Sequence, residues 1–375
     1  MARLAGQRSP TSRTATVRMG RKERKARKLG CMSVEEPKRC LVSVSSDFEK
    51  KADHEQAGPV LLAFVRLKSR PIEGCYGVMT MKSAVLAVVL VLFGRAMAQE
   101  APVVGPASGS LVIVGGGGKE MESILDKFVE LAGGKGARIV VVTTAASSNP
   151  KHNYDRSWIA TFAREKLGVA EVTVLHTHDP KVAKTEEFVK PIKRATGVWF
   201  GGGRQWRLTR AYGGTRSEQE FHRVLERGGV IGGSSAGATI QGSFLARGDT
   251  SGNTIMVGDV QRGFGFMRNT AIDQHLIARG RERDLIEVLE DPEGKMRKEF
   301  DRAAMLGIGI DEDVAIVVQG DRFEVIGKEK GAVLVYDPRK WRKDTLVEAK
   351  WETVRTGDSF DLRNRKVLVK GSGAR

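Results

Sequence analysis

Residues 229–240 read GVIGGSSAGATI, and this stretch decides the class of fold. Its first four residues are typical of a buried strand, and its last three suit the start of a helix. Between them, Gly233-Ser234-Ser235-Ala236-Gly237 is a G-x-S-x-G motif. A sharp strand-to-helix turn of this kind lifts the serine hydroxyl clear of the sheet and points the next backbone N–H towards a developing oxyanion. The motif therefore predicts Ser235 as a nucleophile, with the Ala236 amide beside it.

This turn allows two other interpretations. Gly- and Ser-rich strand-to-helix turns also bind phosphates. The glycine runs at 115–118 and 201–203 are separate candidates for binding phosphate, but the run at 115–118 lacks the spacing of a nucleotide-binding loop. Ser234 is the competing hydroxyl. Only Ser235, however, has glycines two residues away on both sides.

Outward from this turn, short β-branched runs alternate with longer amphipathic stretches, which is typical of βαβ units. The sequence predicts an α/β domain from about residue 108 to 372, with a mostly parallel sheet flanked by helices. Near the end, runs separated by Gly-Asp and Lys-Gly turns are expected to form antiparallel strands. The expected parallel strands are 111–114, 138–142, 172–175, 197–200, 229–232, 270–273 and 306–310, the antiparallel strands 315–319, 323–326 and 332–336, and the helices 120–132, 158–167, 217–227 and 282–289.

The composition is that of a globular protein, with 41% hydrophobic residues, 29% charged residues and 44 glycines among 375. It argues against a disordered, collagenous or multi-pass membrane protein. The net charge of +17 is uneven, because residues 1–98 hold 19 Lys and Arg against 8 Asp and Glu. All three cysteines also lie in that part. We therefore expect no cysteine nucleophile, zinc–thiolate site or intramolecular disulfide from residue 99 onward.

Residues 81–98 have the three-part pattern of a secretory signal peptide: a charged start, an apolar run at 84–93 and a small-x-small site at Ala96-Met97-Ala98. The run is shorter than the roughly 20 residues that span a bilayer. We expect cleavage after Ala98, which leaves an exported (periplasmic or extracellular) chain without a stable membrane anchor. A buried apolar helix is the alternative.

Residues 1–80 precede this pattern and form a basic leader. We interpret these residues as the result of a start codon assigned too early, and expect the true initiator to be Met79 or Met81. The alternative is that they form a genuine disordered arm. A charge run of this kind is usually solvated chain, so we expect no nucleic-acid partner.

A serine nucleophile needs a base and a third group that orients it. Among the histidines after residue 98, His275 ends an expected strand at the carboxyl edge of the sheet, where α/β active sites form. His176 and His178 have no acidic or cysteine cluster around them, so we expect no metal site. Glu312 emerges at the same edge as His275, and Asp249 is the rival acid.

Four motifs occur in order over roughly residues 112–361: Gly202-Gly203-x-Gln205, the G-x-S-x-G segment, Asp273-Gln274-His275 followed by Arg279-x-Arg281, and Gly309-Ile310-Asp311-Glu312. Together they resemble cyanophycinase and related exopeptidases of the S51 serine peptidase family. The resemblance implies a class I glutamine amidotransferase-like three-layer sandwich, a homodimer, and catalysis without metal or cofactor. It implies a catalytic set of Ser235, His275 and Glu312, an oxyanion hole of Gly202, Gly203 and Ala236, and a substrate pocket with Gln205, Asp273, Gln274, Arg279 and Arg281.

The resembling family cleaves β-linked aspartyl dipeptide units from cyanophycin, a poly-aspartate with arginines on its side-chain carboxyls. The resemblance therefore implies a serine exopeptidase that hydrolyses β-aspartyl peptide bonds in cyanophycin or related isopeptides, and the pattern at residues 81–98 adds the expectation that it is secreted. The alternatives are an aspartyl dipeptidase acting on short peptides and a catalytically silent amidotransferase-like binding protein.

The sequence also departs from the family pattern. Asp284 stands where a further arginine is expected, and this charge reversal would repel a substrate carboxylate. We therefore expect slow hydrolysis of cyanophycin and a gain on Asp284→Arg. Arg204 replaces an acid, Leu276 replaces a phenylalanine, and about ten extra residues, expected at 293–302, would reshape the rim of the pocket.

Overall fold

The structure is a computed structural model, and it describes residues 104–147, 161, 164–165 and 168–369. The expected leader, the expected signal peptide and most of the helix expected at 158–167 lie outside these residues. Within the described part of the chain, no helix combines the length and the apolar character needed to cross a membrane.

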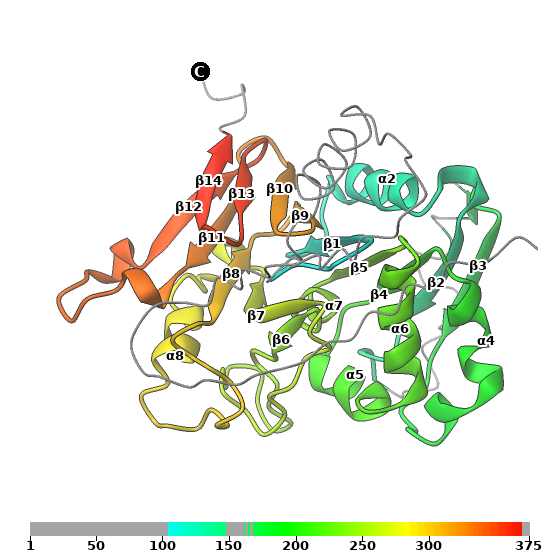
Figure 1. Cartoon of the computed structure of the whole chain (residues 1–375), viewed down its shortest axis with the longest axis horizontal. Helices are drawn as coiled ribbons and strands as arrows, with labels where there is room; N and C mark the ends of the chain where they lie inside the picture. The colour runs from blue at the N-terminus through cyan, green and yellow to red at the C-terminus, as the bar shows by residue number, and fades with distance from the viewer. Residues whose placement is uncertain (1–103, 148–160, 162–163, 166–167, 370–375) are drawn as a thin grey trace, which may run out of the picture. The chain divides into compact units, whose positions relative to one another are not determined.

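A nine-stranded mixed sheet forms the centre of the domain, in the order β14-β13-β10-β9-β1-β5-β4-β2-β3 (Figure 1). The parallel part confirms five predicted strands: β1 (Ser110–Val114), β2 (Arg138–Val142), β3 (Glu171–Leu175), β4 (Gly197–Phe200) and β5 (Val230–Ser234). The antiparallel part comprises β9 (Val314–Gln319), β10 (Arg322–Gly327), β13 (Ser359–Asp361) and β14 (Lys366–Val369).

A second sheet has five strands in the order β12-β11-β8-β7-β6. The structure therefore divides the expected strands between two sheets, because an apolar run shows that a strand is buried but not which strand pairs with it. The strands are β6 (Gly242–Phe244), β7 (Met267–Gln274), β8 (Leu306–Ile310), β11 (Ala332–Tyr336) and β12 (Trp351–Arg355).

Helices cover both faces of the main sheet (Figure 1). Ile124 and Phe128 of α2 (Met121–Leu131) pack on one face, and Phe221 and Val224 of α6 (Arg216–Glu226) belong to the core on the other. The second sheet shares that latter core and buries its far side under α8 (Asp284–Glu290). The remaining helices are α4 (Glu186–Arg194), α5 (Gln205–Tyr212) and α7 (Ala236–Thr239), with 3-10 turns η1 (Gly134–Gly136), η3 (Val182–Lys184), η4 (Ile277–Arg279), η5 (Pro338–Lys340) and η6 (Val347–Ala349).

The two sheets meet at the loop that follows β1. The backbone N–H of His275, just after β7, donates to the Gly115 carbonyl at 3.1 Å. Gly116 pairs with Glu312, just after β8, in an isolated parallel bridge. The Ser235 N–H donates to the Val114 carbonyl at 3.2 Å. Three segments far apart in the sequence are thus joined to the loop after β1 by backbone hydrogen bonds.

Candidate active site

Ser235 occupies a strained turn between β5 and α7, with φ 59° and ψ −117°. A non-glycine residue adopts positive φ only where the surrounding structure holds it there, and such strain gathers at functional sites. The two flanking positions have no room for a side chain, so they must be glycines. A Cβ atom on Gly233 would lie 2.3 Å from the Gly237 carbonyl oxygen, and one on Gly237 would lie 2.0 Å from the Phe200 carbonyl oxygen.

Ser235, His275 and Glu312 form one hydrogen-bonded chain. His275 Nε2 lies 3.0 Å from Ser235 Oγ, and His275 Nδ1 lies 2.5 Å from Glu312 Oε1. His275 also has positive φ, at 55°, and is buried. This arrangement can pass a proton from the hydroxyl to the imidazole while the carboxylate orients the ring.

The other candidate acid, Asp249, has its carboxylate committed elsewhere. Its Oδ1 accepts the backbone N–H groups of Ser251 and Gly252, at 2.8 and 2.9 Å, within its own turn. Arg204 holds the same turn by donating to the carbonyls of Asp249 and Gly252. The geometry thus favours Glu312 as the partner of His275. It also shows that Arg204 stabilises the turn at Asp249.

Gly116 makes room for the histidine, a role that sequence reasoning missed. A Cβ atom at this position would lie 2.4 Å from His275 Nδ1 and 2.8 Å from Glu312 Cγ. Only a residue without a side chain fits behind that hydrogen bond. The run at 115–118 carried a signal in its glycines, but a single sequence does not show which side chain approaches them.

Burial lowers the pKa of His275 below its ordinary value, and the positive charges of Arg279 and Arg281 act in the same direction. The hydrogen bond and the charge of Glu312 oppose this shift. A lowered pKa keeps the imidazole neutral at neutral pH, which is the form that can accept a proton from a serine.

The groups expected to bind an oxyanion lie beside Ser235. Ala236 is the first residue of α7, and the first N–H groups of a helix have no partner within it. A Cβ atom on Gly202 would lie 3.4 Å from Ser235 Cβ, so the Gly202 backbone runs alongside the serine. Gly203 has φ 140°, and a Cβ there would lie 2.2 Å from the Ala145 carbonyl oxygen.

Most of the residues expected in the substrate pocket are buried or hydrogen-bonded to the backbone, and Arg279 is half exposed. Gln205 is buried and donates to the Ala246 carbonyl at 2.7 Å, while its Oε1 has no hydrogen-bond partner among the described residues. Arg281 Nη1 donates to the carbonyl of buried Gln274 at 3.0 Å. The Arg279 side chain is half exposed and lies 3.9 Å from Glu312 Oε1.

Asp273 is fully buried, and both of its carboxylate oxygens accept from Arg247. Arg247 also forms an ion pair with Asp284. This pair argues against the gain in cyanophycin hydrolysis expected from Asp284→Arg, because an arginine there would face the buried guanidinium of Arg247 instead of a substrate carboxylate. Sequence reasoning missed Arg247, which has no motif around it.

The segment expected as an insertion, 293–302, supports the loop that contains Asp249. The Arg297 N–H donates to Gln261 Oε1 at 2.8 Å, and Arg297 Nη2 donates to the Asp259 carbonyl at 2.9 Å. Phe300 packs edge-on against Phe244, with ring centroids 5.2 Å apart. The segment therefore braces the 249–261 loop from outside.

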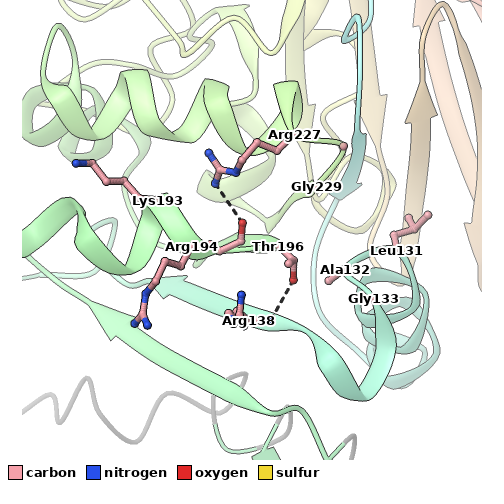
Figure 2. A pocket seen from close by; sticks show the side chains of 11 residues that line it. Leu131, Ala132, Gly133, Arg138, Lys193, Arg194, Thr196, Arg227 and Gly229 are labelled. Atoms are coloured by element: carbon pink, nitrogen blue, oxygen red, sulfur yellow. Dashed lines mark hydrogen bonds between the residues drawn. The ribbon is translucent and has the colours of Figure 1, made fainter. Parts of the chain in front are cut away.

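A cavity of about 580 Å³ lies at the opposite edge of the main sheet, where the parallel strands begin (Figure 2). Its basic side chains already have partners. Arg227 donates to the Ile192 and Ala195 carbonyls at the end of α4. Arg138 and Arg194 both pair with Glu171, which lies outside the lining, and Lys193 pairs with Glu186. These cations complement helix C-termini and nearby acids, so we assign the cavity no role in the chemistry.

The acidic limb of the pH–rate profile should respond to Arg279. Arg279→Gln removes a charge that lowers the pKa of His275, so this pKa should rise. The acidic limb of kcat/KM, which reports the free enzyme, should therefore move to higher pH. The matched control is Arg283→Gln, which removes the same charge from an exposed residue paired with Glu348 and should leave the limb in place. A shift in the control alone would contradict this account.

Comparisons with known proteins identify the family of this chain. Residues 111–326 match the model of peptidase family S51. A cyanophycinase of Geminocystis herdmanii is 29% identical over 71% of this chain and 92% of its own length, and one of Synechococcus elongatus is 30% identical over 70% and 82%. The crystal structure of a peptidase from an acI-B1 Actinobacterium matches with a TM-score of 0.51 at 20% identity, over 68% of this chain and 97% of that one, which supports the fold. The chain is a serine-type peptidase and belongs to peptidase family S51.

Proposed function

We propose that the chain is an exported exopeptidase that acts on β-aspartyl peptides of the cyanophycin type through a serine acyl-enzyme. The hydrogen-bonded chain from Ser235 through His275 to Glu312, with distances of 3.0 and 2.5 Å, carries the proposal. The similarity to cyanophycinases suggests the substrate class.

In the acylation step, His275 Nδ1–H donates to Glu312, which leaves Nε2 able to accept the proton of Ser235. Ser235 Oγ attacks the scissile carbonyl carbon, and its proton passes to Nε2. The carbonyl oxygen becomes negatively charged between the Ala236 N–H and an N–H of the Gly202-Gly203 segment. His275 then gives its proton to the leaving amine, and an ester on Ser235 remains.

In the deacylation step, water replaces the amine. His275 Nε2 accepts a proton from the water as it attacks the ester carbonyl, and Ser235 Oγ leaves with that proton. Glu312 stabilises the imidazolium in both steps. Every proton that leaves a nucleophile returns to a leaving group, so the catalytic set is regenerated.

Hydrolysis of defined substrates tests the substrate class. We expect residues 99–375 to release β-aspartyl-arginine from cyanophycin and to react with a fluorophosphonate at Ser235. Labelling with hydrolysis of short aspartyl peptides alone would point to a dipeptidase. If the chain neither reacted with the fluorophosphonate nor hydrolysed any of these substrates, the result would contradict the proposed enzyme and favour a binding protein.

Export rests on the pattern at residues 81–98. We expect N-terminal sequencing of protein recovered from the native host to begin at or near Gln99. Replacing the small residues Ala96 and Ala98 by glutamine should leave the precursor uncleaved, because the cleavage site requires small side chains. Recovery of residues 1–80 in the mature protein would contradict both the assigned start and export.

A further inference from the structure

We propose that His178 is a positioning residue for the oxyanion hole: it holds the backbone on which the Gly202-Gly203 segment rests. This inference rests on the acyl-enzyme mechanism proposed above. It gives a role to a half-buried histidine that the sequence left without a metal and without a place in the catalytic set.

The Gly202-Gly203 segment is held at both ends by backbone at the end of β2 and just after it. The Gly201 N–H donates to the Val142 carbonyl at 2.9 Å, and the Arg204 N–H donates to the Ala145 carbonyl at 2.8 Å. Gly203 also lies directly against Ala145, with no room for a Cβ atom between them. The directions of the peptide groups in the segment therefore depend on the backbone that carries these two carbonyls.

His178 holds the support loop, which we define as residues 143–146. Its Nε2 lies 2.8 Å from the Thr144 carbonyl oxygen and 3.1 Å from the Ala146 carbonyl oxygen. Because both partners are acceptors only, Nε2 carries the hydrogen and donates to them. The carbonyl between them, that of Ala145, is the one that holds the end of the oxyanion segment. Three consecutive carbonyls thus connect the histidine to the segment.

The support loop depends on this donor because its turn is buried. Thr144 and Ala145 are both fully buried, so a carbonyl that lost its donor there would have little access to water. A buried acceptor without a partner costs free energy. Without the Nε2–H group, we therefore expect the turn to shift until its carbonyls find another donor, and the Ala145 carbonyl to move with it.

His178 is itself fixed, so it can determine the position of the loop. Its ring packs edge-on against the ring of His176, with centroids 4.9 Å apart. The backbone N–H of Thr177 donates to Thr144 Oγ1 at 3.2 Å, and the same oxygen lies 2.5 Å from the hydroxyl of fully buried Tyr212. These hydrogen bonds join the end of β3, the support loop and α5, the helix that follows the oxyanion segment.

A small displacement of the Gly202-Gly203 segment would affect the chemical step. The Gly202 backbone already runs alongside Ser235, and an oxyanion donor has to meet the charge that develops there. Removing one such donor costs on the order of 10²- to 10³-fold in kcat, and a misplacement of about 1 Å costs ~10²-fold. Loss of His178 should therefore slow bond formation at Ser235 and leave binding of the substrate nearly unchanged.

Fluorophosphonate labelling tests this without a peptide substrate, because the phosphoryl oxygen of the reagent enters the oxyanion hole as Ser235 attacks. His178→Leu keeps an apolar side chain of similar bulk but donates no hydrogen bond. We expect it to lower the second-order rate constant of labelling about 10- to 100-fold. On a hydrolysed substrate, kcat should fall by a similar factor while KM stays within about twofold. Hydrogen–deuterium exchange should become faster in peptides covering 142–146 and 201–204.

His178→Gln and His178→Asn form a matched pair that differs in reach. The glutamine amide can place an N–H near the position of the imidazole Nε2, whereas the shorter asparagine amide reaches only the position of Nδ1. We expect the glutamine variant to recover most of the labelling rate and the asparagine variant to resemble His178→Leu. His222→Gln controls for loss of packing, because it removes a half-buried imidazole of α6 that packs on Phe266; it should lower the thermal unfolding temperature without slowing labelling.

Unchanged labelling and exchange in His178→Leu and His178→Asn would overturn the inference. Equal losses in the glutamine and asparagine variants, or an equal loss in His222→Gln, would also overturn it, because packing alone would then explain the effect. The glutamine and asparagine pair decides the matter even if His178→Leu fails to fold. A parent protein that the reagent did not label would refute the proposed acyl-enzyme mechanism; the exchange measurement would still decide whether His178 holds the segment.

Discussion

Replacing Ser235 by alanine is expected to lower kcat by roughly four orders of magnitude or more, because no other group can form the ester. His275→Ala should have a similar effect, since the hydroxyl 3.0 Å from Nε2 then has no base. The double variant should be little worse than either single variant, because the two residues act in one step. Steady-state kinetics on cyanophycin and fluorophosphonate labelling measure these losses.

Ser234→Ala is the matched control for this prediction. Ser234 is the neighbouring hydroxyl, but it ends β5 and forms no part of the hydrogen-bonded chain. We expect the Ser234→Ala variant to retain labelling and most of its activity. If Ser235→Ala kept more than about a tenth of the activity, only ~1.4 kcal/mol of the barrier would depend on its hydroxyl, and the nucleophile would be another residue.

Glu312→Gln is expected to lower kcat by roughly 10²- to 10⁴-fold with the fold intact, because the neutral amide neither holds the imidazole in the required tautomer nor stabilises its cation. Asp249→Asn should cost much less activity, since Asp249 only stabilises its own turn. Measuring kcat and the thermal unfolding temperature of both variants separates loss of chemistry from loss of structure.

The comparison decides between the two acids because both substitutions remove one carboxylate charge and keep the shape of the side chain. A larger loss of kcat in Asp249→Asn than in Glu312→Gln would show that the short contact between His275 Nδ1 and Glu312 Oε1 does not serve catalysis.

The elements found from the sequence are those with a clear local pattern. Every strand of the parallel part was expected within a residue or two, because buried parallel strands are continuous β-branched runs. Helix α4 was missed, since Pro191 lies inside it, and α5 was missed because it directly follows a glycine run. The three- to five-residue strands β6, β12, β13 and β14 were also missed, because a few residues carry no measurable period.

The homodimer and export remain predictions. The homodimer was expected only through the resemblance, and the structure describes a single chain. The signal peptide lies outside the described residues.

The sequence by itself determined the turn at Ser235, because its strain and its need for flanking glycines arise within five consecutive residues. It also indicated His275, which follows a recognisable strand. The tertiary structure decided the rest. Glu312 was distinguished from Asp249 only when β7 and β8 met β1 at Gly115 and Gly116, and Asp284 gained its partner only when Arg247 folded beside it. Contacts between residues tens of positions apart depend on how sheets pair, and this pairing leaves no periodic trace in the chain.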